Sequence, residues 1–482
     1  MENKKTNESE LKQSQAMKLG SGKYVRDTRV RSNRTSVVTG KWDRTVVGYY
    51  AEPDEILDMP KFIDALQKEL GVNVIIMNHP VTYSKDVLEL NPLRESDAYI
   101  GLGHTDDDSD LHHCIQEVHR RGMDFWLYYS GMHGAERYKN WCAVDFNGVP
   151  FSDLAPIPYA VCQLLVTYCP SRVDIREWNR TAYTFGASQY DIDAVYVTHF
   201  RYANPSFFTN LFGCACESCE REAEKKGYNF VEMRKACLSI FDNITRMKTR
   251  NLREAAKLNL SMMDFITLFA DNHAVYDWLH FRASVVSDHL KLIRNSINAC
   301  TGKYFITDTH PPSMALLAGH NYSDLQSGAS DGFMPLSWLD TQIMSTVAAW
   351  SHLLIHLVPG LDEATSLKII KNFFGLGNIQ LPGDRIDNLG IKKNWYDPDV
   401  SWNATAEFYN HYSQEQIYAL CNNELTKLSM FNTKNHPVFP VIKGREWERS
   451  TCEQVIERCL DLDCAGYVFQ WVDNFIDASK LK

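Results

Sequence analysis

The sequence lacks any run of about 18 apolar residues, the length that a helix needs to cross a bilayer. The first ten residues contain no apolar stretch and therefore do not read as a secretion signal. We expect a cytoplasmic protein without a membrane partner, whose substrates are imported or made inside the cell.

A strong basic segment is also lacking. The 50 Lys and Arg residues face 60 Asp and Glu residues, which leaves a net charge of −10. Nucleic-acid binders usually present a basic face, so we expect no nucleic-acid partner. The four arginines between residues 26 and 34 are better interpreted as part of a solvated tail. A Gly-rich phosphate loop between a strand and a helix is missing as well, which disfavours a nucleotide-binding fold.

What the 482 residues do contain is typical of a folded globular protein, with 44% hydrophobic and 23% charged residues. Residues 1–43 are polar and aperiodic, which predicts a flexible N-terminal tail. From residue 44 to 482, short apolar runs alternate with amphipathic stretches. The predicted strands are 45–51, 72–78, 123–130, 193–200, 303–308, 331–338, 436–443 and 464–471.

Helical spacing lies between these runs, at 60–70, 111–121, 229–258, 273–299, 341–358 and 403–430. Strands that alternate with helices imply parallel pairing, and eight of them predict a closed (β/α)₈ barrel of the α/β class. An open doubly wound sheet is the alternative. Pro437 and Pro440 make the seventh strand the weakest of the eight, because proline cannot donate to a sheet. Long gaps after strands four and six predict two insertions, at 203–228 and 359–402.

The sharpest local motif is Cys-x-Cys-x-x-Cys at Cys214, Cys216 and Cys219. Thiolates at this spacing suit tetrahedral Zn²⁺, and Cys169 is the fourth ligand that we predict. Four thiolates leave no open position, so the Zn²⁺ would be structural. The alternatives are a reduced cysteine-rich turn and a redox role. The thirteen cysteines make a disulfide framework a poor interpretation in a large chain without an export signal.

The segment from Cys169 to Arg176, followed by the three clustered cysteines, resembles the zinc module of the family 42 glycoside hydrolases, the β-galactosidases. Residues 190–202 (YDIDAVYVTHFRY) are similar to the YDVDGIxLDxxRY segment of many glycoside-hydrolase-like barrels, and 317–338 are similar to a later stretch of the same group. These resemblances imply a glycoside hydrolase. Thr198 stands where that group has Asp, and the strand lacks the Asn-Glu pair of family 42. One expected carboxylate is therefore absent or has moved.

Reacting groups of such barrels lie at the C-terminal ends of the strands and in the loops that follow. Glycoside hydrolysis needs a proton donor and a second group that attacks or activates water. The catalytic candidates are Glu52, Asp308, Glu446, His199 and His133, and the substrate-binding candidates are Arg201, Tyr202, His310, Trp338 and Trp471. Arg201 would suit a carboxylate or sulfate on an acidic sugar, because guanidinium presents a planar fork of donors. The tryptophans would stack on a sugar face.

Each candidate also has a structural interpretation. Glu52 could cap the first helix, the histidines could be hydrogen-bonded structural residues, and the tryptophans could be packing residues. Arg201 could pair with Asp191 or Asp193 inside the barrel wall.

Three functions stay open. The first is a glycoside hydrolase that acts on a small glycoside, acidic sugars included, with a non-standard acid/base constellation. The second is a sugar-acid lyase or isomerase that uses His199 or His133 as its base. The third is a non-catalytic carbohydrate-binding barrel. A homo-oligomer is compatible with each.

Overall fold

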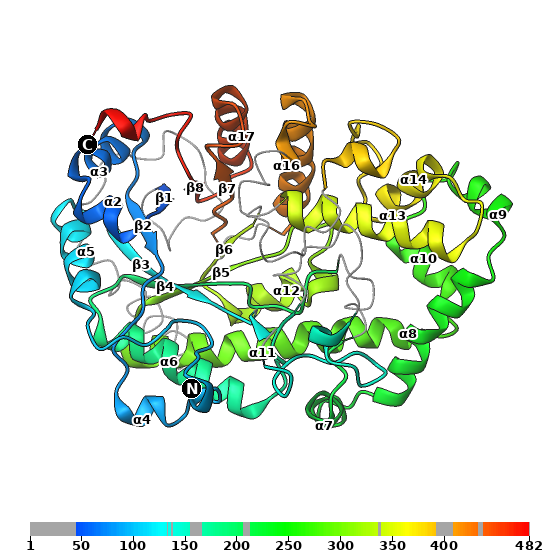
Figure 1. The fold of residues 1–482 in the computed structure, drawn as a ribbon, viewed down its shortest axis with the longest axis horizontal. Coiled ribbons are helices and arrows are strands. Elements are labelled where there is room, and N and C mark those ends of the chain that lie inside the picture. Colours follow the sequence, from blue (N-terminus) through cyan, green and yellow to red (C-terminus); the bar gives the residue numbers. More distant parts are fainter. Residues whose placement is uncertain are drawn as a thin grey trace, which may run out of the picture.

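The computed structural model describes residues 45–132, 134–135, 138–154, 166–205, 213–335, 339–391, 408–431 and 437–481. Its centre is a sheet of eight parallel strands in the order β6-β5-β4-β3-β2-β1-β8-β7 (Figure 1). The predicted (β/α)₈ barrel is confirmed, and each predicted strand contains an observed one. The strands are β1 Val46–Tyr50, β2 Val74–Met77, β3 Asp124–Ser130, β4 Ala194–Thr198, β5 Tyr304–Asp308, β6 Gly332–Met334, β7 Val441–Lys443 and β8 Gly466–Gln470.

The barrel closes between β6 and the residues just before β7. Phe333 forms a parallel bridge with Val438, and the Phe439 N–H donates to the Phe333 carbonyl over 2.8 Å. The two prolines fit this edge because each uses its carbonyl as an acceptor. The Pro437 carbonyl accepts from the Phe333 N–H, and the Pro440 carbonyl accepts from the Val468 N–H. The prolines do shorten β7, which starts at Val441 and not at the predicted residue 436.

Alternate residues of the strands separate two apolar cores. Val46, Val74, Ile76, Trp126 and Ile306 belong to the cluster inside the barrel. Their neighbours along the strands, such as Val47 and Ile75, belong to the larger cluster between the strands and the helices. This alternation follows from the two-residue period of a strand. It also sets which side chains at the strand ends face the barrel axis.

Three strands are fastened at their N-terminal ends, at the bottom of the barrel, by an Asn or Asp side chain. Asn73, Asp193 and Asp331 directly precede β2, β4 and β6, and each accepts a 3.0 Å hydrogen bond from a backbone N–H of the strand before. Asp331 also accepts from the guanidinium of Arg294 at 2.7 and 2.9 Å. These buried carboxylates and the amide therefore hold the pairs β1–β2, β3–β4 and β5–β6 in register.

The helices cover the outside of the barrel, and most predicted helical stretches are confirmed. The predicted helix at 229–258 is two helices, α8 and α9. The described part of the predicted helix at 403–430 contains two helical residues, Phe408 and Tyr409, and then α16, which begins after Ser413, whose side chain forms a capping box with Gln416. The helices are α2 Pro53–Leu57, α3 Pro60–Ala65, η1 Leu66–Leu70, α4 Lys85–Leu88, α5 Ser109–Arg120, α6 Val173–Gln189, α7 Glu217–Lys225, α8 Phe230–Thr245, α9 Thr249–Ala255, α10 Met262–Phe269, α11 Ala274–Thr301, α12 Tyr322–Asp324, η9 Leu339–Met344, α13 Ser345–Leu357, α14 Glu363–Phe373, α16 Gln414–Ser429 and α17 Arg449–Asp461.

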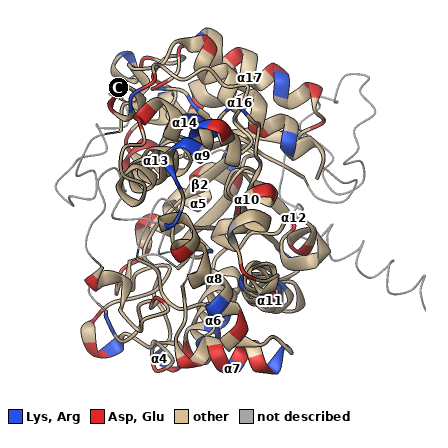
Figure 2. Ribbon diagram, turned by 90° about the vertical axis from the view of Figure 1, so that its right-hand side faces the viewer, with Lys and Arg blue, Asp and Glu red and all other residues tan. Residues whose placement is uncertain are grey.

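The two long connections, after β4 and after β6, meet on one flank of the barrel. Helices α9, α10, α13 and α14 gather there (Figure 1), and Thr249 and Arg253 donate to the carbonyls of Pro359 and Gly360. Outer helices such as α7 and α17 carry acidic and basic residues together (Figure 2). Within the described ranges, no helix is both long and apolar enough for a membrane span.

Candidate active site and cysteine cluster

Asp308 is the last residue of β5 and lies on the inward face of the barrel, two and four residues after Ile306 and Tyr304. Its side chain is only 1% exposed. One carboxylate oxygen accepts from the Thr198 hydroxyl at 2.9 Å, and the other accepts from the backbone N–H of His199 at 3.0 Å. Burial raises the pKa of Asp308, while Arg201 and the two hydrogen bonds oppose the rise. The site therefore holds a carboxyl group that tends to keep its proton.

The donors to Asp308 come from the end of β4, where the backbone bends sharply. His199 has a φ of 55°, which is rare for a residue with a β-carbon. The bend is held from the end of β3, since Gly131 and Met132 donate to the carbonyls of Thr198 and His199 at 2.7 and 3.0 Å. A side chain at Gly131 would come within 2.6 Å of the Thr198 carbonyl. Backbone strain of this kind is common at functional sites.

Three tyrosines lie next to Asp308 at the top of the inner core. Tyr50 donates to the hydroxyl of Tyr196 at 2.9 Å, and the Tyr128 ring lies 5.3 Å from that of Tyr196. Burial raises the pKa of each tyrosine, and the charge of Asp308 contributes to the rise in all three. The sequence analysis missed these tyrosines. Adjacent tyrosines at 49–50 and 128–129 gave no sign of which one faces the axis.

Glu52 follows β1, is exposed, and occupies the N-cap position of α2. Its backbone N–H donates to the carboxylate of Glu55 at 3.0 Å, so the capping interpretation describes the local structure. The charge of Glu52 nevertheless raises the pKa of Tyr128, together with that of Asp308. The two carboxyl groups therefore act on the same tyrosine from strands on different sides of the barrel.

Arg201 and His310 lie just beyond the ends of β4 and β5 and are 1% and 0% exposed. Burial lowers the pKa of Arg201 to about 10 and that of His310 well below its usual value. Within the described ranges, Nε and Nη2 of Arg201 and both ring nitrogens of His310 have no hydrogen-bond partner. The alternative pairing of Arg201 with Asp193 is wrong, because Asp193 binds His119 at 2.8 Å.

His320 ties these two strand ends together. Its Nδ1 accepts from the His310 backbone N–H at 3.0 Å, and its Nε2 lies 3.1 Å from the Phe200 carbonyl. This pair of contacts requires a proton on Nε2 and none on Nδ1. Burial lowers the pKa of His320 to about 3, which keeps this neutral form at physiological pH. His320 was not among the sequence candidates.

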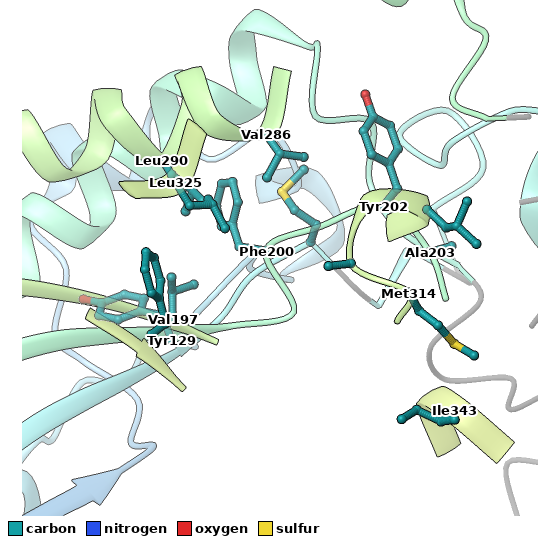
Figure 3. Packing of buried hydrophobic residues seen from close by; sticks show 14 of the residues in the cluster. Tyr129, Val197, Phe200, Tyr202, Ala203, Val286, Leu290, Met314, Leu325 and Ile343 are labelled. Carbon is teal, nitrogen blue, oxygen red and sulfur yellow. The ribbon is translucent and has the colours of Figure 1, made fainter. Parts of the chain in front are cut away.

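Tyr202, a predicted substrate-binding residue, lies in the outer core. Its ring packs under the guanidinium of Arg282 at 4.2 Å, and it lies in the same packed cluster as Phe200, Val286 and Met314 (Figure 3). The Tyr202 hydroxyl has no hydrogen-bond partner in the part of the chain that the structure describes.

The remaining candidates lie at the ends of β7 and β8. Lys443 is buried as the last residue of β7, and its Nζ lies 5.1 Å from the centre of the Trp471 ring. The guanidinium of Arg445 lies 4.8 Å from the same ring. Trp471 is half-buried with a φ of 61°, and Glu446 is half-buried in the β7–α17 loop. His133 and Trp338 lie outside the described residues.

The four predicted metal ligands come together in space. The sulfur atoms of Cys169, Cys214, Cys216 and Cys219 all lie within 4.8 Å of one another. Individual separations from Cys169 are 3.4 Å to Cys216 and 3.5 Å to Cys219. Tetrahedral Zn–S bonds of about 2.3 Å place sulfurs about 3.8 Å apart, so this donor set fits Zn²⁺. None of the described cysteines forms a disulfide.

Hydrogen bonds connect the cysteine cluster to the barrel. The Val144 N–H donates to the Cys214 sulfur at 3.4 Å, as is common around metal-bound thiolates. The backbone N–H of Tyr168, next to Cys169, donates to the Met132 carbonyl at 2.7 Å. Because Met132 in turn donates to His199, a short chain of bonds runs from the cluster to the backbone that holds Asp308.

No protein-family model and no curated protein matches this sequence. Among solved structures, the chain resembles the PgaB (BpsB) glycoside hydrolase domain from Bordetella bronchiseptica, with 7% identity, a TM-score of 0.48, and 91% of this chain and 98% of that chain covered. It also resembles the catalytic domain of beta-amylase from Paenibacillus polymyxa, with 11% identity, a TM-score of 0.43, and 90% and 94% covered. Likenesses this distant carry no information on the reaction, which we therefore infer from the site.

Proposed function

We propose that this protein is a glycoside hydrolase that acts on a small carbohydrate glycoside, with Asp308 as its general acid. The observation that carries the proposal is the buried Asp308 carboxyl, which faces the barrel axis at the C-terminal end of β5 and whose pKa is raised by burial. A carboxylic acid whose protonated form is favoured by burial can protonate the glycosidic oxygen as the bond breaks.

Glu52 is the second carboxylate that we propose. It is exposed after the end of β1, and its charge acts on Tyr128 together with that of Asp308. Glycoside hydrolysis requires two carboxyl groups, one as proton donor and one that attacks or activates water. Glu52 would activate a water molecule or attack the anomeric carbon, and Glu446 is the alternative for this role.

Thr198 and the His199 backbone act as positioning groups in this proposal. They hold one oxygen each of the Asp308 carboxyl and leave the other lone pairs of those oxygens for substrate. Thr198, which replaces the Asp of glycoside-hydrolase-like barrels, thus donates to a carboxyl that comes from the neighbouring strand. We interpret the missing carboxylate as one that has moved to β5.

We further propose that the four cysteines hold a structural Zn²⁺. The separations of their sulfur atoms suit tetrahedral thiolate coordination, and four protein ligands close the coordination sphere. The metal would supply no chemistry to the reaction. It would fasten the segment before α6 and the segment before α7 to the end of β3, which supports the backbone around His199.

Glycosides that differ in their leaving group test whether Asp308 is the general acid. Asp308→Asn and Glu52→Gln are compared with the unaltered protein on paired nitrophenyl and methyl glycosides of one sugar. A nitrophenolate leaves with little protonation, so Asp308→Asn should lower kcat about 10²–10⁴-fold on the methyl glycoside and much less on the nitrophenyl one. Glu52→Gln should lower kcat on both glycosides, whereas Glu446→Gln should lower kcat less on each of them.

Two results would contradict the proposal. Equal losses on both glycosides in Asp308→Asn would remove Asp308 from the role of acid. An unsaturated, UV-absorbing product in place of a reducing sugar would identify a lyase.

A further inference from the structure

Among the described residues, two side chains just beyond the ends of β4 and β5 have four polar atoms without hydrogen-bond partners, although both side chains are almost fully buried. They are Nε and Nη2 of Arg201 and the two ring nitrogens of His310. Buried donors and acceptors are nearly always paired, since an unpaired one costs about 1–3 kcal/mol. Two such residues side by side therefore require an explanation.

The pair is built into a fixed frame. Arg201 and His310 each come two residues after a group of the Asp308 site, His199 on one side and Asp308 itself on the other. His320 bridges the two segments through the Phe200 carbonyl and the His310 N–H. The remaining Arg201 nitrogen, Nη1, donates to the Tyr202 carbonyl at 3.2 Å, which fixes the guanidinium plane. The Nε–Nη2 edge of the guanidinium is thus held in place without a hydrogen-bond partner in the part of the chain that the structure describes.

The charges around the pair are unusual for this chain. The whole sequence has a net charge of −10, yet Arg201, just beyond β4, and Lys443, at the end of β7, are buried at the same end of the barrel as the Asp308 carboxyl. Burial favours the protonated form of Asp308, which lessens the repulsion between that carboxyl and a bound anion. The charge of Asp308 acts on Arg201 but leaves Nε and Nη2 without a hydrogen-bond partner among the described residues, and a carboxylate on the sugar would supply one.

We propose that Arg201 and His310 form a subsite for the carboxylate of a sugar acid, so that the substrate is a uronide and not a neutral glycoside. The inference rests on the proposed function for the place of the sugar but concerns its recognition alone. Nε and Nη2 of Arg201 present the fork that pairs with a carboxylate. A neutral imidazole offers one donor and one acceptor, which matches the hydroxyl beside that carboxylate.

Binding of free sugars tests this subsite without any turnover. Calorimetric titration of the 482-residue chain compares D-glucuronate and D-galacturonate with D-glucose and D-galactose, and includes acetate as a small anion. We expect a uronate to bind at least tenfold more tightly than its neutral partner and than acetate. Arg201→Lys, which keeps the charge and loses the fork, and His310→Gln should each weaken binding about tenfold or more.

Two controls separate this inference from the proposed hydrolysis. Asp308→Asn should still bind the uronate although it loses turnover. Arg445→Gln removes a positive charge from the same rim and should leave uronate binding unchanged.

Equal affinity for uronates and neutral sugars would overturn the inference even if glycosides are hydrolysed. Acetate that binds as tightly as the uronates would also overturn it, because the pair would then hold any small anion. An equal loss of uronate affinity in Arg445→Gln would show that a general electrostatic attraction, and not a local subsite, holds the uronate.

Discussion

Replacing Thr198 by Val should shift the titration of Asp308 by an amount that the geometry fixes. The substitution keeps the shape of the side chain and removes the hydroxyl that donates to Asp308 at 2.9 Å, with both groups buried. A hydrogen bond to a charged group contributes about 1.5–3 kcal/mol, and one pKa unit corresponds to about 1.36 kcal/mol. The pKa of Asp308, already raised by burial, should therefore rise by about one to two further units.

The sign of the pH dependence follows from this direction. Because the pKa of Asp308 is higher in the folded than in the unfolded protein, the folded state binds more protons between the two values. The contribution of this group to stability is full at low pH and is lost as the pH rises through the folded pKa. Thr198→Val should extend this loss to higher pH. Its destabilisation should be small in acid and grow to about 1.5–3 kcal/mol where Asp308 is ionised.

Two assays check the shift. Urea unfolding at a series of pH values measures the stability difference, and the pH profile of kcat/KM measures the limb on which the acid loses its proton. That limb should move toward higher pH in Thr198→Val. Thr198→Ser keeps the donor and is the matched control, with an unchanged profile. If the Val variant has the pH dependence of the Ser variant in both assays, Thr198 does not stabilise the Asp308 carboxylate and our account of the site is wrong.

Three further predictions concern the metal, the barrel floor and the strand bend. Cys214→Ser should lower bound Zn²⁺ from about one per chain and lower Tm by several degrees, measured by elemental analysis and calorimetry, whereas the exposed Cys300→Ser should change neither. Asp331→Ala, which leaves Arg294 without its carboxylate, should cost about 3–5 kcal/mol in urea unfolding; a cost below 1 kcal/mol would contradict the fastening of β5 to β6. Gly131→Ala should lower kcat while changing stability little, because its β-carbon would displace the end of β4 beneath Asp308. An unchanged kcat would contradict the role of this bend in positioning Asp308.

The strands could be predicted because each is covered on both faces and reads as a continuous apolar run. The limits of β6 and β7 could not be predicted. The barrel closes there through a single bridge and through the carbonyls of two prolines, and the apolar runs of the sequence do not show this pairing. The break at 410–413, between the helical residues Phe408 and Tyr409 and α16, was not predicted, although the Ser413–Gln416 capping box was present in the sequence. Propensity locates an element, whereas caps and neighbouring strands set its ends.

The candidate site was predictable as a set of residue types at strand ends, and Asp308 and Arg201 were found in this way. Their partners were not, because Thr198 and Asp308 are 110 residues apart in the sequence and meet only through the pairing of β4 with β5. The bridging role of His320 depends on a loop conformation that no local pattern encodes. The four cysteines were predicted together, because one motif contains three of them and the resemblance of the preceding segment to a known zinc module indicated Cys169 as the fourth.

The measurement that tests the central claim most directly is the product formed from a uronide. The purified protein and its Asp308→Asn variant are each incubated with methyl glucuronides and galacturonides of both anomeric configurations, and the products are followed by proton NMR. We predict free uronic acid from at least one of the four substrates with the unaltered protein, and a much slower release with the variant. Intact substrates in the presence of a folded, metal-loaded protein, or equal rates from both proteins, would contradict the claim.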